Sequence, residues 1–140
     1  MLARMHQHIV EELQQGARTD TVFVVTAVLF NLVVLGVNSA VAGEAASRGG
    51  DTAAQDVTLV IFMLMTVLVN SIAIIALNTG KQTRAKLLAG VLRMYTDEGI
   101  AAYYDASLLA NYNRRYASFI GVILCLAATA VLVPLVIRFL

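Results

Sequence analysis

Charged side chains are scarce in this chain. Only 14% of its 140 residues are Asp, Glu, Lys or Arg, whereas 59% are hydrophobic. A water-soluble domain usually carries about 25% charged residues. The shortfall excludes an ordinary soluble surface, and it indicates that much of the chain faces lipid.

Other absences narrow the range of possible functions. The only cysteine, Cys125, has no second thiol for a disulfide or a zinc site, and the net charge of +1 gives no strong field that would recruit nucleic acid. His6 and His8 are two residues apart, so they do not face each other on a helix. No phosphate-binding loop or hydrolase motif is present. We predict no nucleic-acid partner, no metal, no cofactor and no catalytic residue, and hence a protein that is not an enzyme.

Three long runs contain no charged residue at all: Thr21–Ala42, Val57–Thr79 and Ala117–Ile137, of 22, 23 and 21 residues. A helix needs about 20 apolar residues to cross a bilayer. Lipid offers no hydrogen bonds to the backbone, so each crossing must be helical. The sequence therefore predicts an all-α integral membrane protein with three transmembrane helices.

The same runs divide the chain into six segments. They are an N-terminal amphipathic cytoplasmic helix (1–18), a first crossing (19–43), an outer loop (44–56), a second crossing (57–80), a cytoplasmic helical segment (81–116), and a third crossing with the C-terminus (117–140). We expect Thr19 or Asp20 to start the first crossing and Asp56 to cap the second. Gly43 and Gly80 are the expected ends of these two helices.

The distribution of Lys and Arg predicts the orientation. Eight of the ten lie in the N-terminal tail and in the segment between the second and third crossings, whereas only Arg48 and Arg138 lie on the opposite side. Short cytoplasmic segments carry the excess of positive residues. We therefore expect a bacterial-type inner (plasma) membrane, with the N-terminus in the cytoplasm and the C-terminus outside.

Both cytoplasmic segments show helical periodicity. Apolar residues recur along Leu2–Gln15 and predict an amphipathic helix, on the membrane surface or on the protein's own cytoplasmic part, that stops at Gly16. The inner segment predicts one helix near Gln82–Tyr95, a break at Thr96–Gly99, and a second helix near Ile100–Asn111. The two would form a hairpin or one kinked helix.

Asp97 and Glu98 at this break are a pair of neighbouring acids. Acids favour the start of a helix, where they complement its positive end. We expect them to cap the second inner helix or to pair with Arg93. A site for a hard cation is the alternative.

The crossings contain amides, hydroxyls and small residues in place of charges. Asn31 and Asn70 have matching depths in antiparallel helices, so we predict that their amides pair. Gly121, Cys125 and Thr129 follow each other at intervals of four, which favours close helix packing. The predicted residues of a helix interface or a pore are Asn31, Asn38, Thr66, Asn70, Gly121, Cys125 and Thr129.

A second group of candidate residues flanks the crossings on the inner side. Arg and Lys reach lipid phosphates there, and Tyr favours the interface. The predicted contacts with lipid headgroups or with a partner are Lys81, Arg84, Lys86, Arg114, Arg115 and Tyr116.

These features predict a non-catalytic membrane subunit or adaptor. Its crossings would anchor it in the bilayer and drive assembly with copies of itself or with a membrane complex, while its cytoplasmic helices contact a partner. The alternative is a homo-oligomeric channel or pore lined by the Asn- and Thr-bearing faces. A membrane enzyme is a weaker alternative, because no titratable groups cluster at one depth.

Overall fold

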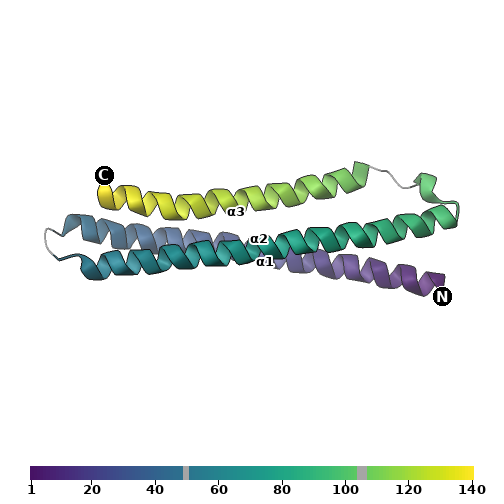
Figure 1. Ribbon diagram of the computed structural model, residues 1–140, viewed down its shortest axis with the longest axis horizontal. Coiled ribbons are helices and arrows are strands. Elements are labelled where there is room, and N and C mark those ends of the chain that lie inside the picture. The colour runs from purple at the N-terminus through teal and green to yellow at the C-terminus, as the bar shows by residue number, and fades with distance from the viewer. Residues whose placement is uncertain (49–50, 104–106) are drawn as a thin grey trace.

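The protein is an elongated bundle of long helices. The computed structural model describes residues 1–48, 51–103 and 107–140, and this part of the chain is all helical apart from its connections. The elements are α1 (Leu2–Ser47), α2 (Ala53–Asp97), a short 3₁₀ turn η1 (Ala101–Tyr103) and α3 (Ser107–Phe139). Figure 1 shows the start of α1 and the end of α2 together at one end, which we call the tip. The α1–α2 connection and the C-terminus lie at the other, the loop end.

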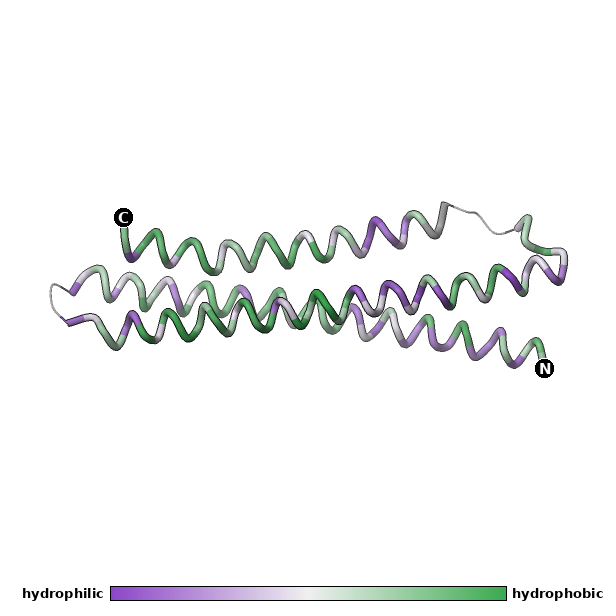
Figure 2. The backbone as a smooth tube through the Cα atoms, in the orientation of Figure 1, coloured by the Kyte–Doolittle hydropathy of each residue, from purple (hydrophilic) through white to green (hydrophobic). Residues whose placement is uncertain are grey.

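Each of the three helices is long and apolar enough to cross a membrane, as the sequence predicts. The 46 residues of α1 and the 45 of α2 also exceed that need. At 1.5 Å per residue each is about 68 Å long, roughly twice the hydrocarbon thickness of a bilayer. Figure 2 shows hydrophobic residues dense toward the loop end and hydrophilic residues more frequent toward the tip. Residues 2–20 of α1 and 80–97 of α2 therefore form an extension, here named the stalk.

Three contacts fix the register of α1 against α2. From the tip inward they join His6 to Tyr95, Asp20 to Gly80, and Asn31 to Asn70. The residue numbers of each pair add up to 100 or 101, so the two helices run antiparallel from the tip to the middle of the bundle without a slip. The helix α3 packs against both, parallel to α1.

Several predicted helix ends are wrong. The helix α1 passes through Gly16, Thr19 and Gly43 without interruption, and α2 passes through Gly80. A glycine inside a helix costs only about 1 kcal/mol, and contacts with a neighbouring helix along the whole length outweigh that cost. The tail is thus the first part of α1, and it packs on the protein's own inner segment.

The start of α2 also differs from the prediction. The helix begins at Ala53 behind Thr52, so Asp56 lies within its first turn and does not cap it. An acid in the first turn still complements the positive end of the helix.

The helix α2 ends inside the break that the sequence predicts at Thr96–Gly99. The helix α2 continues through Gln82–Tyr95 and ends at Asp97, and Gly99 follows with a φ of +72°. Glycine adopts this left-handed conformation without the strain that a side chain would bring. The predicted second helix near Ile100–Asn111 is replaced by η1 and by the start of α3, with residues 104–106 outside the described part of the chain.

The apolar core lies between the stalk and the middle of the bundle. Ala27 from α1, Ala73 and Leu77 from α2, and Tyr116 and Ile123 from α3 form one buried cluster. Small residues at Ala27 and Ala73 let the helices approach closely, which is how helices pack in lipid. This layer separates the polar groups on either side of it.

Candidate functional site

The middle of the bundle holds a closed pair of amides. Asn31 Nδ2 donates to Asn70 Oδ1 at 2.8 Å, and Asn70 Nδ2 donates to Asn31 Oδ1 at 2.9 Å. Each amide also donates to the carbonyl oxygen four residues earlier in its own helix, that of Ala27 or Thr66. The predicted pairing is confirmed, and both amide donors of each side chain are satisfied inside one chain.

The other two buried polar residues of this region are Thr66, which has a hydrogen-bond partner, and Asn38, which has none in the described part of the chain. The Thr66 hydroxyl donates to the Phe62 carbonyl oxygen at 2.7 Å within α2. Asn38 is 0% exposed, and neither its amide nitrogen nor its oxygen has a hydrogen-bond partner in the described part of the chain. A buried amide without partners is costly, so Asn38 is the weak point of this core.

The small-residue stripe on α3 points away from the other helices. Gly121 and Cys125 are exposed, and a Cβ on Gly121 would meet no atom within 4 Å. Thr129 is half-buried, and its hydroxyl bonds to the Cys125 carbonyl. The stripe therefore makes no close helix contact within the described chain. Its role at an interface with a second chain stays a prediction.

A polar cluster joins all three helices at the base of the stalk. The Tyr116 hydroxyl donates to Asp20 Oδ2, and Gly80 leaves the space that the Asp20 carboxylate occupies. The Arg84 guanidinium lies beside the Tyr116 hydroxyl and 4.5 Å from the centre of the Tyr112 ring. Burial and the neighbouring Asp20 carboxylate raise the pKa of Tyr116, so this tyrosine stays a hydrogen-bond donor.

The predicted headgroup residues fall into two sets. Tyr116 is only 3% exposed and faces the core, so the structure does not place it at a headgroup. Arg84 is half-buried, and its Nε is buried without a hydrogen-bond partner. Lys86, Arg114 and Arg115 are exposed. Lys81 is half-buried.

The loop end is held by one ion pair that the sequence did not reveal. Arg138 near the end of α3 donates to both carboxylate oxygens of Asp56, at 2.7 and 3.1 Å, and to Thr52 Oγ1 at 2.7 Å. The hydrogen bond with Arg138 lowers the pKa of Asp56. These residues are 82 and 86 positions apart, so only the bundle brings them together.

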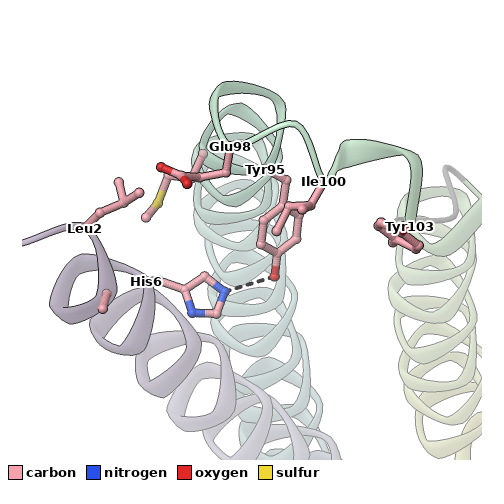
Figure 3. A pocket seen from close by; sticks show the side chains of 8 residues that line it. Leu2, His6, Tyr95, Glu98, Ile100 and Tyr103 are labelled. Carbon is pink, nitrogen blue, oxygen red and sulfur yellow. Dashed lines mark hydrogen bonds between the residues drawn. The ribbon is translucent and has the colours of Figure 1, made fainter.

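The tip carries an open, mostly apolar cleft of about 770 Å³. It is lined by Leu2, Ala3, His6, Met94, Tyr95, Glu98, Ile100 and Tyr103, and we call it the tip cleft. In Figure 3 His6 and Tyr95 meet across it, with 2.9 Å between His6 Nε2 and the Tyr95 hydroxyl oxygen. This volume lies in the range of sites that hold small molecules or anchoring side chains.

The tip cleft is lined by one acidic side chain, Glu98, and Asp97 precedes it in the chain. Asp97 and Glu98 are the last residue and the C-cap of α2, not the start of a following helix as predicted. The carbonyl groups at this end already carry about half a negative charge, and no basic residue lies in the last turn. Within the described residues the ion pairs join Arg48 to Glu44 and Arg138 to Asp56, so neither acid pairs with Arg93.

Sequence reasoning missed the base of the stalk and the tip cleft for one reason. Both depend on a register between α1 and α2 that passes through Gly16 and Gly80, where the sequence suggested helix ends. Extending the predicted Asn31–Asn70 pair by antiparallel counting would have placed Asp20 opposite Gly80 or Lys81.

The described residues show no arrangement for metal binding. No three His, Cys, Asp or Glu side chains in residues 1–48, 51–103 and 107–140 lie close enough together to hold an ion. The fold and these sites define a class: an all-helical bundle whose three long helices are apolar enough to span a membrane. Comparison with protein-family models, with curated proteins and with solved structures found no match to this chain.

Proposed function

We propose that this protein is a non-catalytic membrane adaptor whose stalk holds a partner on the cytoplasmic side. The observation that carries the proposal is the tip cleft at the end of the stalk. Side chains that a soluble protein would bury, such as Ile100 and Tyr103, are exposed there at 45% and 90%. An apolar surface of this kind outside the apolar spans favours contact with another protein.

The stalk keeps the cleft at a distance from the bilayer. Eighteen residues of α1 separate Leu2 from Asp20, at the start of the charge-free run. At 1.5 Å per residue this places the tip about 27 Å along the helix from the edge of the apolar run. Helices that continue unbroken into the spans make the stalk a firm support, which suits an adaptor.

The acidic residues at the tip favour a partner that carries positive charge. Asp97 and Glu98 end α2 and make no ion pair within the described residues. We propose that the occupant is a basic amphipathic helix. Its apolar side chains would enter between Leu2 and Ile100, and its Lys or Arg side chains would meet Glu98.

The runner-up function, a pore, receives less support. The side-chain amides of Asn31 and Asn70 form hydrogen bonds with each other inside one chain. On the tip side of this pair lies the apolar cluster of Ala27, Ala73, Leu77 and Ile123. A conducting path needs polar groups or water along its length, and neither feature provides them within the chain. A path between several chains stays the alternative.

Assembly with other chains is also part of the proposal. The spans expose large apolar side chains on every helix, among them Leu29, Leu64 and Leu124. Gly121 on α3 offers the close approach that helices use in lipid. We propose that this face of α3 contacts a second copy or another membrane subunit.

A peptide titration tests the adaptor proposal. The protein is placed in nanodiscs of phosphatidylcholine alone, because a basic peptide also binds anionic lipid. A fluorescent 18-residue Leu/Lys amphipathic helix is titrated and its anisotropy measured. We expect saturable binding that empty nanodiscs lack. Ile100→Ser should weaken it roughly tenfold, since it removes most of a buried apolar side chain.

The controls distinguish a specific charge contact at the tip cleft from a general effect of the protein's charge on binding. Glu98→Lys should weaken binding by about three- to fivefold, as expected for an exposed charge contact. Glu11→Lys makes the same charge change on the stalk away from the cleft, and should have little effect. Equal binding of a Leu/Glu helix, or equal losses in the two Lys variants, would overturn the proposed partner chemistry.

A further inference from the structure

A groove runs between α1 and α2 at the base of the stalk. It has a volume of about 290 Å³, and among the described residues Tyr116 is the one lining residue that belongs to α3. Toward the spans the groove begins at Phe23 and Ala76, inside the charge-free runs, and toward the tip it ends at Glu12 and Leu87. We call this surface the base groove.

Small side chains keep the base groove open. Gly16 and Thr19 line it from α1, and Ala76 and Thr79 line it from α2. A Cβ on Gly16 would meet no atom within 4 Å, so the groove has free space at this point. Small residues let a further helix approach closely. The base groove therefore has the shape of a surface that receives a helix.

The outward face of α3 is a matching surface. Exposed residues recur on it at spacings of three and four, which place them on one side of the helix. They are Ala110, Arg114, Ala117, Gly121, Cys125 and Ala128. All but Arg114 are small, and a Cβ on Gly121 would meet no atom within 4 Å. This face can therefore come close to a neighbouring chain.

The base groove and the outward face of α3 lie at the same depth. Thr19 and Gly16 are two and five residues before the first charge-free run, and Arg114 is three residues before the third, which begins at Ala117. At 1.5 Å per residue these positions lie about 3, 7.5 and 4.5 Å outside the runs. Copies inserted in the same orientation bring α3 of one chain level with the base groove of another. There α3 would run parallel to α1, as it does in its own chain (Figure 1).

The charges of the two surfaces are complementary. The base groove has two carboxylates, those of Glu12 and Asp20, against the one guanidinium of Arg84. Glu12 is exposed and makes no ion pair within the described residues, and the same holds for Arg114 on α3. Side chains lean toward the N-terminus of their helix. Because the N-terminus of α3 lies toward the tip, the Arg114 side chain leans in the direction of Glu12.

We propose that α3 of a second copy occupies the base groove, with Ala117 against Thr19 and Arg114 near Glu12. The inference rests on the assembly that we propose for the face of α3, and it identifies the surface that this face meets. Since the base groove and the α3 face are different surfaces, the contact joins copies head to tail. Such a contact can close into a ring within the membrane.

Disulfide cross-linking between two differently tagged copies tests the contact. One copy carries Thr19→Cys and the other Ala117→Cys, both with Cys125→Ser, so a mixed product forms only between chains. We expect oxidation in membranes to give at least five times more mixed product than a control with Arg18→Cys, outside the groove, in place of Thr19→Cys. Equal yields would overturn the proposal. A dominant disulfide between two Ala117→Cys chains would show a symmetric α3–α3 contact, which retains the assembly and removes the groove from it.

A charge exchange tests the register of the contact. Arg114→Glu should raise the apparent dissociation constant of the oligomer about threefold, as expected for an exposed ion pair. Adding Glu12→Arg should restore it, whereas adding Glu11→Arg, the neighbouring acid outside the groove, should not. Equal rescue by both reversals would exclude a specific contact between Arg114 and Glu12.

Filling the base groove tests its occupation separately. Gly16→Leu and Gly36→Leu both add a side chain to α1 where a Cβ meets no atom within 4 Å, but only Gly16 lines the groove. Dissociation on dilution in detergent is followed by native mass spectrometry. We expect Gly16→Leu and Gly121→Leu each to raise the apparent dissociation constant at least tenfold, and Gly36→Leu to change it less than twofold.

The outcomes of this dilution experiment distinguish the groove from the assembly. Equal effects of Gly16→Leu and Gly36→Leu would overturn the groove contact. An oligomer that Gly121→Leu weakens and Gly16→Leu does not would retain the proposed interface on α3 and overturn its placement in the base groove. A monomeric unsubstituted protein would overturn both.

Discussion

The middle of the bundle and the tip both involve α1 and α2 but differ in how their surfaces are used. In the middle, Asn31 and Asn70 satisfy each other and the flanking apolar residues are buried. At the tip, Leu2, Ile100 and Tyr103 are exposed around an open cleft, and Glu98 has no ion-pair partner among the described residues.

This difference indicates a division of labour along one pair of helices. Groups that are satisfied inside the chain stabilise the bundle, so their substitution should lower stability. Groups left open at the tip contribute little to folding, so their substitution should alter binding and leave stability unchanged. The stability predictions below test how groups that are satisfied, or left unsatisfied, inside the chain contribute to the fold.

The largest expected effect on stability comes from Gly80. A Cβ there would lie 2.6 Å from Asp20 Oδ1, so Gly80→Ala must displace the carboxylate that Tyr116 holds. The lost contact costs about 2 kcal/mol and the better helix propensity of alanine returns about 1. We expect a net loss of about 1 kcal/mol, seen as a lower thermal midpoint by circular dichroism in detergent.

The matched control is Gly16→Ala. A Cβ at Gly16 meets nothing within 4 Å, so the substitution should gain about 1 kcal/mol from helix propensity alone. Effects of the same sign in the two variants would mean that the close contact between Asp20 and Gly80 does not exist.

The amide pair should show coupling of about 0.6 kcal/mol, and no more than about 2. Asn31→Leu leaves Asn70 without its partner, and Asn70→Leu does the reverse, so the double variant should lose less than the sum of the single losses. A thermodynamic cycle on thermal or denaturant unfolding measures this. Strictly additive losses would show that the two amides do not interact.

Asn38 offers a contrast with the satisfied pair. Its amide is buried without partners in the described chain, so Asn38→Leu should be neutral or stabilising, by up to about 1 kcal/mol. The same unfolding measurement checks it. A clear loss of stability would mean that Asn38 has a partner in the assembled protein.

The smallest effect is expected from the ion pair at the loop end. Since Arg138 lowers the pKa of Asp56 below its usual 3.8, the pair stabilises the fold above that pH and the contribution is lost as pH falls through the folded-state pKa. Arg138→Gln should therefore flatten the fall in thermal midpoint between about pH 5 and 3. An unchanged pH dependence of the thermal midpoint would mean that the Asp56–Arg138 pair does not contribute to stability.

The sequence predicts the spans better than the stalk. Long charge-free runs and the matching depths of Asn31 and Asn70 carry enough information to place three helices and one contact. Helix ends were misplaced at Gly16 and Gly80, because local propensity favours a stop there whereas packing along the neighbouring helix keeps both helices intact.

The tip cleft is harder to predict from the sequence than the spans are, for the same reason. Asp97 and Glu98 fit the start of a helix by residue type, yet they end α2 in the structure. Only the unbroken register brings Leu2 and His6 beside Tyr95. The tip cleft therefore could not be derived from the apolar pattern of either segment alone.

The central claim is that the stalk and its tip cleft lie in the cytoplasm, and cysteine labelling tests it most directly. Single cysteines replace the exposed residues Ala46 at the loop end and Ala89 on the stalk, in a variant with Cys125→Ser. Intact cells are treated with a membrane-impermeant maleimide. The account predicts that position 46 is labelled in intact cells and position 89 only after permeabilisation. Labelling of position 89 but not of position 46 in intact cells would contradict it.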